Sequence, residues 1–401
     1  MSTCIACARQ QPRAKLSNPI TTSAAAIAAV TFSASGAAPT PLYHLYEQSF
    51  GLTPFMVTIV FAAYVLSLLM ALLTVGSLSD YIGRRPAILA ALVMNAAAMA
   101  MFITADSVGA LIAARALQGF ATGFATATLG AAILDIDRNR GNLLNSITAF
   151  TGLTAGALGA AILVTYAPYP RQLVFVVLLL ASIIEALVLC FMPETTKPKP
   201  VVLAALRPHV SIPLQARGML ARLTPVTIAS WALGGFYFSL MPALVRVATG
   251  ITSPVLGGLV VSALTLSGVL SVLSLRALPA DRILAGAIVA LASGVAITLA
   301  GVHVQLAWLM LAGTIVSGTG FGAVFSSTMR MVLPLAKPDE RAGLLAAFYV
   351  EGYLSFSLPA VLTGFFAPIV GLSAAADAYG AAVIGMALLS LLAVRLSRQR
   401  A

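Results

Sequence analysis

The sequence predicts an all-α, polytopic membrane protein with twelve transmembrane helices, on the evidence of its composition, its apolar runs and the distribution of its charges. Hydrophobic residues form 60% of the 401-residue chain and charged residues only 9%, whereas soluble domains carry about 25% charged residues. A transmembrane helix needs about 20 apolar residues. The chain is therefore long enough for roughly twelve such helices joined by short loops.

The apolar runs fall into two groups of six, separated by a polar segment rich in Pro, Lys and Arg. The runs of the first group lie at 20–43, 54–76, 87–105, 108–133, 143–166 and 173–192. Those of the second group lie at 223–248, 254–275, 283–302, 305–330, 342–368 and 378–396. We therefore expect an N-terminal bundle at 20–193, a central loop at 194–222, a C-terminal bundle at 223–396, and cytoplasmic tails at 1–19 and 397–401.

The first run permits a second interpretation. Arg9, Arg13 and Lys15 precede it and small residues occupy 34–37, a combination that also occurs in cleavable signal peptides. Cleavage would leave eleven helices and place the two termini on opposite sides of the membrane.

The basic residues predict the orientation of the helices. If the N-terminus is cytoplasmic, all but three of the 23 Lys and Arg residues fall on the cytoplasmic side, the exceptions being Arg115, Arg171 and Arg246. This bias agrees with the positive-inside rule and places both termini in the cytoplasm. The net charge of +11 is then explained by topology, and we expect no nucleic-acid partner.

The two groups of helices resemble each other at an offset of about 200 residues. The paired segments are Thr53-Pro54 with Ser253-Pro254, Gly119-x-x-x-Gly123 with Gly318-x-x-x-Gly322, and 140–144 with 341–345. Each pair falls in the same loop or helix of its group. The sequence therefore predicts a duplicated six-helix unit.

A charged turn of eleven residues, from Gly76 to Pro86, joins the second and third runs. The glycines and charged residues of this turn are Gly76, Asp80, Gly83, Arg84 and Arg85. The glycines permit close backbone approach, and the arginines can pair with Asp80 or with lipid phosphate. The pattern Gly-x-Leu-x-Asp-x-x-Gly-Arg-Arg resembles the loop 2-3 signature of the major facilitator superfamily of secondary transporters, as does the Met192-Pro193-Glu194-Thr195 ending of the sixth run.

That resemblance implies two six-helix bundles related by pseudo-two-fold symmetry, with the substrate bound between them and released by alternating access. It also implies that Gly76, Asp80 and Arg84 pack against the eleventh helix and hold the outward-facing state closed on the cytoplasmic side. The corresponding turn of the second group, 276–282, keeps charge but lacks the glycines. We therefore expect the two turns to differ in how they close the cytoplasmic side.

Arg115 lies inside the fourth run, in the segment Arg115-Ala-Leu-Gln118-Gly119-Phe-Ala-Thr122-Gly123. At helical spacing Arg115, Gln118, Gly119 and Thr122 share one face. The segment resembles the fourth-helix motif of the superfamily, whose arginine is associated with proton transfer or with binding of a substrate anion. The structural alternative is an arginine that clamps helix carbonyls.

Two acidic residues also lie inside apolar runs, where ionisable groups are costly and are functional candidates. Glu351 lies about 14 Å into the eleventh helix, where desolvation would let it take up and release a proton near neutral pH. Glu185 lies on the sixth helix, which in this fold packs at the periphery. For each, the alternative is a carboxyl group kept neutral for packing alone.

The fifth run carries an incomplete signature of the superfamily's drug and proton antiporters. Gly152, Gly156 and Gly159 permit close helix packing, as Gly119 and Gly123 do in the fourth run. The proline and the last glycine of the antiporter pattern are replaced by Ala157 and Ala160. The pattern is therefore compatible with antiport without marking it.

Fold analogy assigns the lining of the substrate cavity to the first, fourth, seventh and tenth helices. The candidates are Ser33, Ser35, Tyr43, Gln118, Thr122, Trp231, Tyr237, Ser317 and Thr319. Mild polarity with aromatic rings favours amphiphilic organic molecules over highly charged ones. Taken singly, each aromatic residue is equally compatible with lipid contact or packing.

We expect no enzyme activity and no cofactor, because the chain lacks a P-loop, a metal-ligand spacing among its three histidines, and a nucleophile beside a base. Cys4 and Cys7 have a metal or redox spacing but supply only two ligands. The predicted function is efflux of a small organic molecule across a bacterial inner membrane, driven by protons, by a monomer in the lipid bilayer. Proton symport of a metabolite and a non-transporting membrane sensor are the alternatives.

Overall fold

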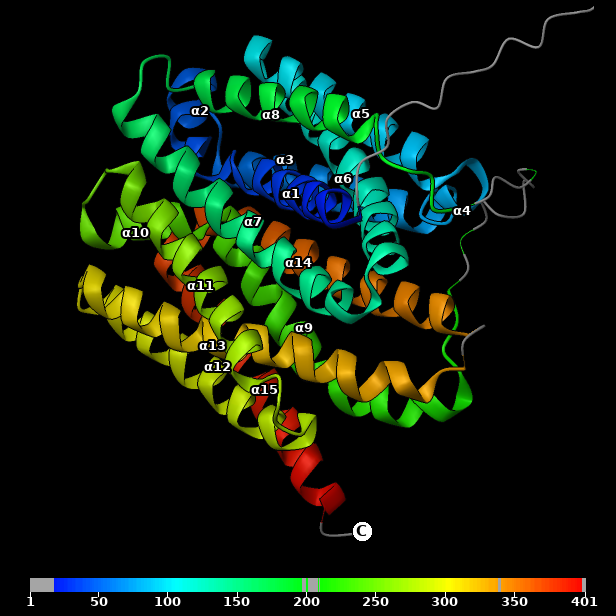
Figure 1. Cartoon of the computed structure of the whole chain (residues 1–401). Helices are drawn as coiled ribbons and strands as arrows, with labels where there is room; N and C mark the ends of the chain where they lie inside the picture. The colour runs from blue at the N-terminus through cyan, green and yellow to red at the C-terminus, as the bar shows by residue number, and fades with distance from the viewer. Residues whose placement is uncertain (1–17, 197–199, 201–207, 209, 338–339, 399–401) are drawn as a thin grey trace, which may run out of the picture.

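The structure is a computed structural model that describes residues 18–196, 200, 208, 210–337 and 340–398, and every regular element in these residues is helical (Figure 1). The predicted all-α fold is therefore confirmed. Cys4, Cys7 and most of the predicted N-terminal tail lie outside the described residues.

The first half of the chain forms the helices coloured blue to green in Figure 1. Its elements are α1 (Asn18–Ala37), η1 (Thr40–Leu42), α2 (Tyr43–Phe50), α3 (Pro54–Thr74), α4 (Ser79–Ile82), α5 (Arg84–Thr104), α6 (Val108–Ile136), α7 (Arg138–Tyr166) and α8 (Leu173–Leu189). Side-chain caps define two of the helix starts, because Thr53 accepts a hydrogen bond from the Met56 amide and Ser107 accepts one from the Ala110 amide, each at 3.3 Å.

The second half forms the helices coloured green to red, most of which lie below the first half in the same view (Figure 1). Its elements are α9 (Leu214–Ser239), α10 (Met241–Thr249), α11 (Pro254–Leu275), α12 (Ala280–His303), α13 (Ala307–Val332), η3 (Leu333–Leu335), α14 (Arg341–Val370) and α15 (Leu372–Arg398).

The helices match the predicted apolar runs one by one. Within the described residues, ten helical segments are long and apolar enough to cross a membrane, and the bent pair α9–α10 makes eleven if it is counted as one span. The predicted sixth run is α8, a shorter apolar helix of 17 residues. The largest difference is at α9, which begins at Leu214 rather than near 223, because Ala216 and Leu220 are buried while Arg217 and Gly218 between them are exposed.

The first span of each half is broken at the same place. Pro41 lies between α1 and α2, and Pro242 lies in the first turn of α10, which is bent by 64° from α9. Proline lacks the amide needed to continue a helix and breaks it. The offset of 201 between these two prolines continues the internal repeat seen in the sequence.

The halves pack through two helix pairs that exchange roles under the repeat: α3 against α14, and α7 against α11. Small residues make both contacts close. A Cβ at Gly364 would meet the Thr58 side chain, and one at Gly258 would meet Ala157 and Ala161. Such exchange of the second and fifth spans is what a two-fold relation between two repeated units produces.

Candidate functional site

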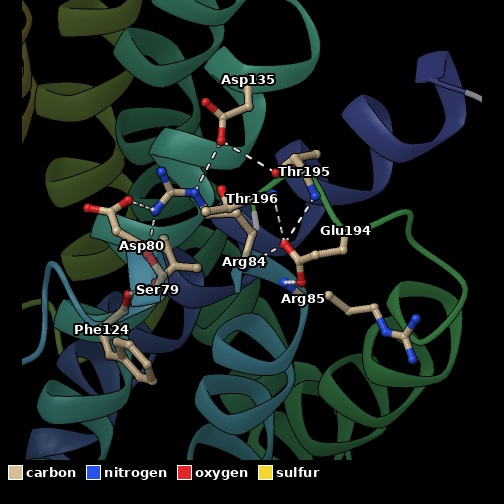
Figure 2. A network of polar contacts seen from close by, with 10 residues as sticks. Ser79, Asp80, Arg84, Arg85, Phe124, Asp135, Glu194, Thr195 and Thr196 are labelled. Atoms are coloured by element: carbon tan, nitrogen blue, oxygen red, sulfur yellow. Dashed lines mark hydrogen bonds and ion pairs between the residues drawn. The ribbon is translucent and has the colours of Figure 1, made fainter. Parts of the chain in front are cut away.

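The charged connection between α3 and α5 is organised around the Arg84 side chain, which is largely buried (Figure 2). Its guanidinium lies 2.5 Å from Asp80, 3.1 Å from Asp135 at the end of α6, and donates a 2.6 Å hydrogen bond to Ser79. The two carboxylates and the hydroxyl surround one cation. The end of the bundle that carries this connection is called the charged end below.

Glu194 holds the first turn of α5 from outside the connection (Figure 2). Its carboxylate accepts hydrogen bonds from the backbone amides of Arg84 at 2.8 Å and Arg85 at 3.2 Å. Free amides at a helix N-terminus favour a carboxylate in this position. Gly83 has φ of +100°, and a Cβ there would meet the Glu194 carboxylate, so glycine is required by both conformation and space.

The contacts of this connection described above all belong to the first half. A Cβ at Gly76 would approach Ala127 of α6, and Asp135 is also on α6. Sequence reasoning did not identify Asp135 or the capping role of Glu194, although an acidic residue at the end of an apolar run was the available signal. The expected packing of Gly76, Asp80 and Arg84 against the eleventh helix stays a prediction.

Arg115 is fully buried in α6, and the groups it contacts are neutral. Its Nη1 donates to the Gly36 carbonyl and to Gln118 Oε1, each at 2.9 Å, and its Nη2 donates to the Tyr43 hydroxyl at 2.6 Å. The cation also lies 5.8 Å from the ring centre of Tyr43 and 5.2 Å from that of Tyr64. The positive charge is thus held by carbonyls, a hydroxyl and aromatic faces.

Glycines bring α6 and α7 close to their neighbours. A Cβ at Gly119 or Gly123 would collide with the α3 backbone, and one at Gly152 or Gly156 would collide with the α1 backbone. In contrast, a Cβ at Gly159 would meet nothing within 4 Å, so close packing is not what this glycine provides.

An aromatic cluster of the second half faces the first half around Trp231. It consists of Trp231, Phe325, Phe348, Tyr349, Tyr353 and Phe356. Trp231 lies edge-on to Tyr353 with ring centres 5.0 Å apart, and Phe356 reaches Phe61 of α3 at 5.2 Å. Tyr64, whose ring lies beside the Arg115 cation, and Tyr353 both pack against the same buried cluster between the halves. Aromatic surface and a buried cation are therefore adjacent.

Glu351 lies on α14 beside this cluster and faces Thr224 of α9. Its Oε1 is buried and has no hydrogen-bond partner among the described residues. A buried carboxyl oxygen without a donor is better tolerated in the neutral acid than in the carboxylate.

The structure does not bring all the cavity candidates together. Tyr43, Gln118 and Thr122 gather around Arg115, whereas Ser33 lies between α1 and α7. Tyr237 is buried inside the second half, 2.8 Å from the Thr314 hydroxyl, and Ser317 packs against Gly294 of α12. Thr319 lies in a groove with Arg282, between α11, α12 and α13.

The end of the bundle opposite the charged end, called the far end below, is joined across the two halves. Arg246 of α10 donates to Glu47 of α2 at 2.7 Å, and Thr40 donates to the Phe238 carbonyl at 3.1 Å. A cavity between these residues encloses about 10 Å³, roughly the minimum for one water molecule. The far end is therefore closed.

Comparisons with known proteins agree with this architecture. The family model of the Major Facilitator Superfamily matches residues 25–360, and no curated relative matches the sequence. Similar solved structures include a peptide transporter bound to alafosfalin, with a TM-score of 0.74, 14% identity, and 93% of each chain covered. The nucleoside transporter NupG has a TM-score of 0.67 and 13% identity over 93% of this chain and 98% of its own. The human organic anion transporter MFSD10 has a TM-score of 0.64 and 16% identity over 94% of this chain and 100% of its own.

Proposed function

Because the chain belongs to the major facilitator superfamily, we propose that it is a secondary transporter that exports a small, amphiphilic organic molecule with aromatic character in exchange for protons. The observation that carries this proposal is the aromatic cluster around Trp231 beside the buried Arg115, between the two halves. Rings such as these bind planar organic molecules by stacking, and a cation beside them orients a polar group of the substrate.

The charges and contacts of the molecule support a proposal for its orientation and state. The positive-inside rule supports a cytoplasmic location for the charged end and both termini, and we propose a bacterial inner membrane as the site of action. The ion pair between Glu47 and Arg246 then closes the outer side. These contacts support an inward-facing state, to which a substrate would gain access from the cytoplasm.

Proton coupling is proposed for Glu351, whose unpartnered oxygen favours the neutral acid in this state. No cofactor is needed, because the proton gradient supplies the energy. The protein is proposed to act as a monomer, because each chain holds both halves of the transport path.

A second candidate function is proton symport that imports an organic anion. It is favoured by one observation: the described partners of Arg115 are neutral groups, which leaves its charge available to a carboxylate. Substrate entry by this route requires that the Tyr43 hydroxyl release the guanidinium.

Trp231 allows a direct binding test, because the chain has two tryptophans and the other, Trp308, is 74% exposed on α13. In a Trp308→Phe variant in lipid vesicles, the fluorescence reports on Trp231 alone. We expect saturable quenching by aromatic organic compounds, and no saturable quenching in the matched Trp231→Phe variant. If neither aromatic anions nor neutral aromatic compounds quench the Trp231 fluorescence, the proposed substrate class is contradicted.

Transport in vesicles with an imposed pH gradient separates the two functions. Export by antiport predicts that substrate and protons move in opposite directions, whereas symport predicts that they move together. Glu351→Gln is expected to abolish coupling to the gradient while substrate exchange continues. Unchanged proton-driven transport in that variant would overturn the assignment of Glu351.

A further inference from the structure

A network of buried polar side chains in the first half extends from Arg115 to Ser182, one helical turn from a second carboxyl group, that of Glu185, which is hydrogen-bonded to α1. We infer that Glu185 is a further proton-binding site, whose protonation is transmitted through this network to the α1 carbonyls that hold Arg115. The inference rests on the proton coupling proposed above, and it assigns a part of that coupling to the first half of the molecule.

The network begins on α8. Thr31 of α1 donates a 2.5 Å hydrogen bond to Glu185 Oε1, across 154 residues of sequence. The other oxygen, Oε2, is buried and has no hydrogen-bond partner among the described residues. Although α8 is peripheral and many of its side chains are exposed, the Glu185 carboxyl group points inward, to α1.

Asn95 of α5 continues the network from the next turn of α8. Its Nδ2 donates to Ser182 Oγ at 2.9 Å and to Ser35 Oγ at 3.3 Å. Ser182 precedes Glu185 by three residues and lies on the same helix face. Asn95 and Ser35 are both fully buried, and Asn95 Oδ1 has no partner within the described part of the chain.

The connection to Arg115 passes through Gln118 and the backbone of α1. Gln118 Nε2 donates to the Ser35 carbonyl at 2.7 Å, while Gln118 Oε1 accepts from Arg115 Nη1. The same guanidinium nitrogen donates to the carbonyl of Gly36, the residue after Ser35. Two sets of hydrogen bonds, Glu185–Thr31 and Ser182–Asn95–Ser35–Gln118–Arg115, thus lie one helical turn apart on both α8 and α1.

These buried polar side chains lack a hydrogen-bond donor for some of their oxygen atoms. Glu185 Oε2 and Asn95 Oδ1 are both acceptors, and both are buried without a donor. A proton on Glu185 converts one of these acceptors into a donor, which removes the need for a donor at that oxygen. Loss of that proton leaves a buried carboxylate with a single hydrogen bond, which favours a shift of α1 toward further donors.

Few other charges act on Glu185. In α1, α5, α7 and α8, the helices packed together here, the other ionisable residues are Arg84 and Arg85 in the first turn of α5, and Arg138, Arg140 and Tyr166 at the ends of α7. Arg84 is itself occupied by Asp80 and Asp135. Arg115 is therefore the buried cation that this network reaches.

Infrared difference spectroscopy of the full chain in lipid vesicles tests the site without any substrate. Stepping the pH is expected to reveal the C=O band of a protonated buried carboxyl group that disappears in Glu185→Gln and persists in the matched Glu351→Gln variant. Thr31→Val, which leaves the carboxyl group in place, is expected to move the frequency of this band. If Glu185→Gln loses none of the titrating C=O bands of the wild type, the inference is overturned.

A second measurement on the same samples tests whether protonation of Glu185 affects Arg115. Asn95→Leu interrupts the network between Ser182 and Ser35, and we expect it to abolish the spectral response of the arginine guanidinium modes to Glu185 titration. If those modes respond equally in wild type and Asn95→Leu, the network does not carry the signal and the inference fails.

Proton flux measurements distinguish this inference from the proposed function. If the wild type carries substrate without protons, the proposed function fails, while the infrared result still decides whether Glu185 binds a proton. If the wild type couples transport to protons and Glu185→Gln couples equally well, the proposed function stands and the role of Glu185 is wrong.

Discussion

At the scale of single residues, burial of the Arg115 charge carries a large electrostatic cost for the fold. A fully buried guanidinium is tolerated because its Nη atoms find three acceptors and its faces lie against two rings. These acceptors come from α1, α2 and α6. Movement of any one of these elements therefore changes how well the charge is held.

Arg115→Lys keeps the charge and loses the planar fork of donors. One ammonium nitrogen cannot reach Gly36, Gln118 and Tyr43 together, and a hydrogen bond to a charged group contributes about 1.5–3 kcal/mol. We expect the initial transport rate in vesicles to fall at least about tenfold, which corresponds to about 1.4 kcal/mol. Arg171→Lys, at an arginine that lies over the Phe50 ring, is the control, and full activity of Arg115→Lys would exclude the forked geometry.

Asp80→Asn should affect transport more than folding. The Asp80 side chain is 50% exposed, so its ion pair contributes at most about 1 kcal/mol, and Arg84 keeps Asp135 and Ser79. We expect slower transport with normal membrane insertion and normal quenching of Trp231 by ligands. Lost insertion or lost binding would show that Asp80 serves stability instead of the conformational change.

At the scale of helices, small residues decide how closely the spans approach. Gly119→Val would place a side chain against the Tyr64 carbonyl of α3, and overpacking of this kind costs about 1–3 kcal/mol. We expect a lower unfolding temperature in detergent and reduced transport. Gly159→Val, where a Cβ meets open space, is the matched control and is expected to unfold like the wild type.

Helix number and sequence position were predictable, because a chain in a bilayer satisfies its backbone inside helices and apolar length then defines each span. The grouping of Arg115 with Gln118 and Thr122 was also predictable from helical spacing. The rotation of each helix was not, because the faces of spans such as α1 and α8 differ little in polarity. The partners of Glu185, the inward position of Tyr237 and the groove beside Thr319 depend on that rotation. Asn95, a polar residue in the middle of an apolar run, was a signal that sequence reasoning did not use.

At the scale of the whole molecule, the ion pair between Glu47 and Arg246 joins the two halves at the far end. Both side chains are mostly buried, so we expect Glu47→Gln to weaken closure of that end by about 1 kcal/mol, or roughly fivefold in population. Alkylation of a Ser239→Cys variant, built on a background without the three native cysteines, measures the opening, because Ser239 is buried in the closed end.

Exchange of the charges provides the control for this experiment. Glu47→Arg combined with Arg246→Glu restores the attraction in the opposite sense, and we expect protection of the cysteine to return. Equal alkylation in wild type, single variant and double variant would mean that this ion pair does not contribute to closure.

The shortness of α8 connects the protein with the thickness of its membrane. Its 17 residues span about 26 Å, whereas the hydrocarbon layer is about 30 Å thick. Leu180, Ile184 and Leu187 are exposed along it, so this hydrophobic mismatch draws the surrounding lipid thinner. Because Glu185 lies on α8, a change in the acyl-chain length of the lipid is expected to move Glu185 relative to Thr31. Transport rates measured in lipids of graded chain length are expected to fall as the bilayer thickens, and a flat profile would show that α8 adapts without moving the carboxyl group.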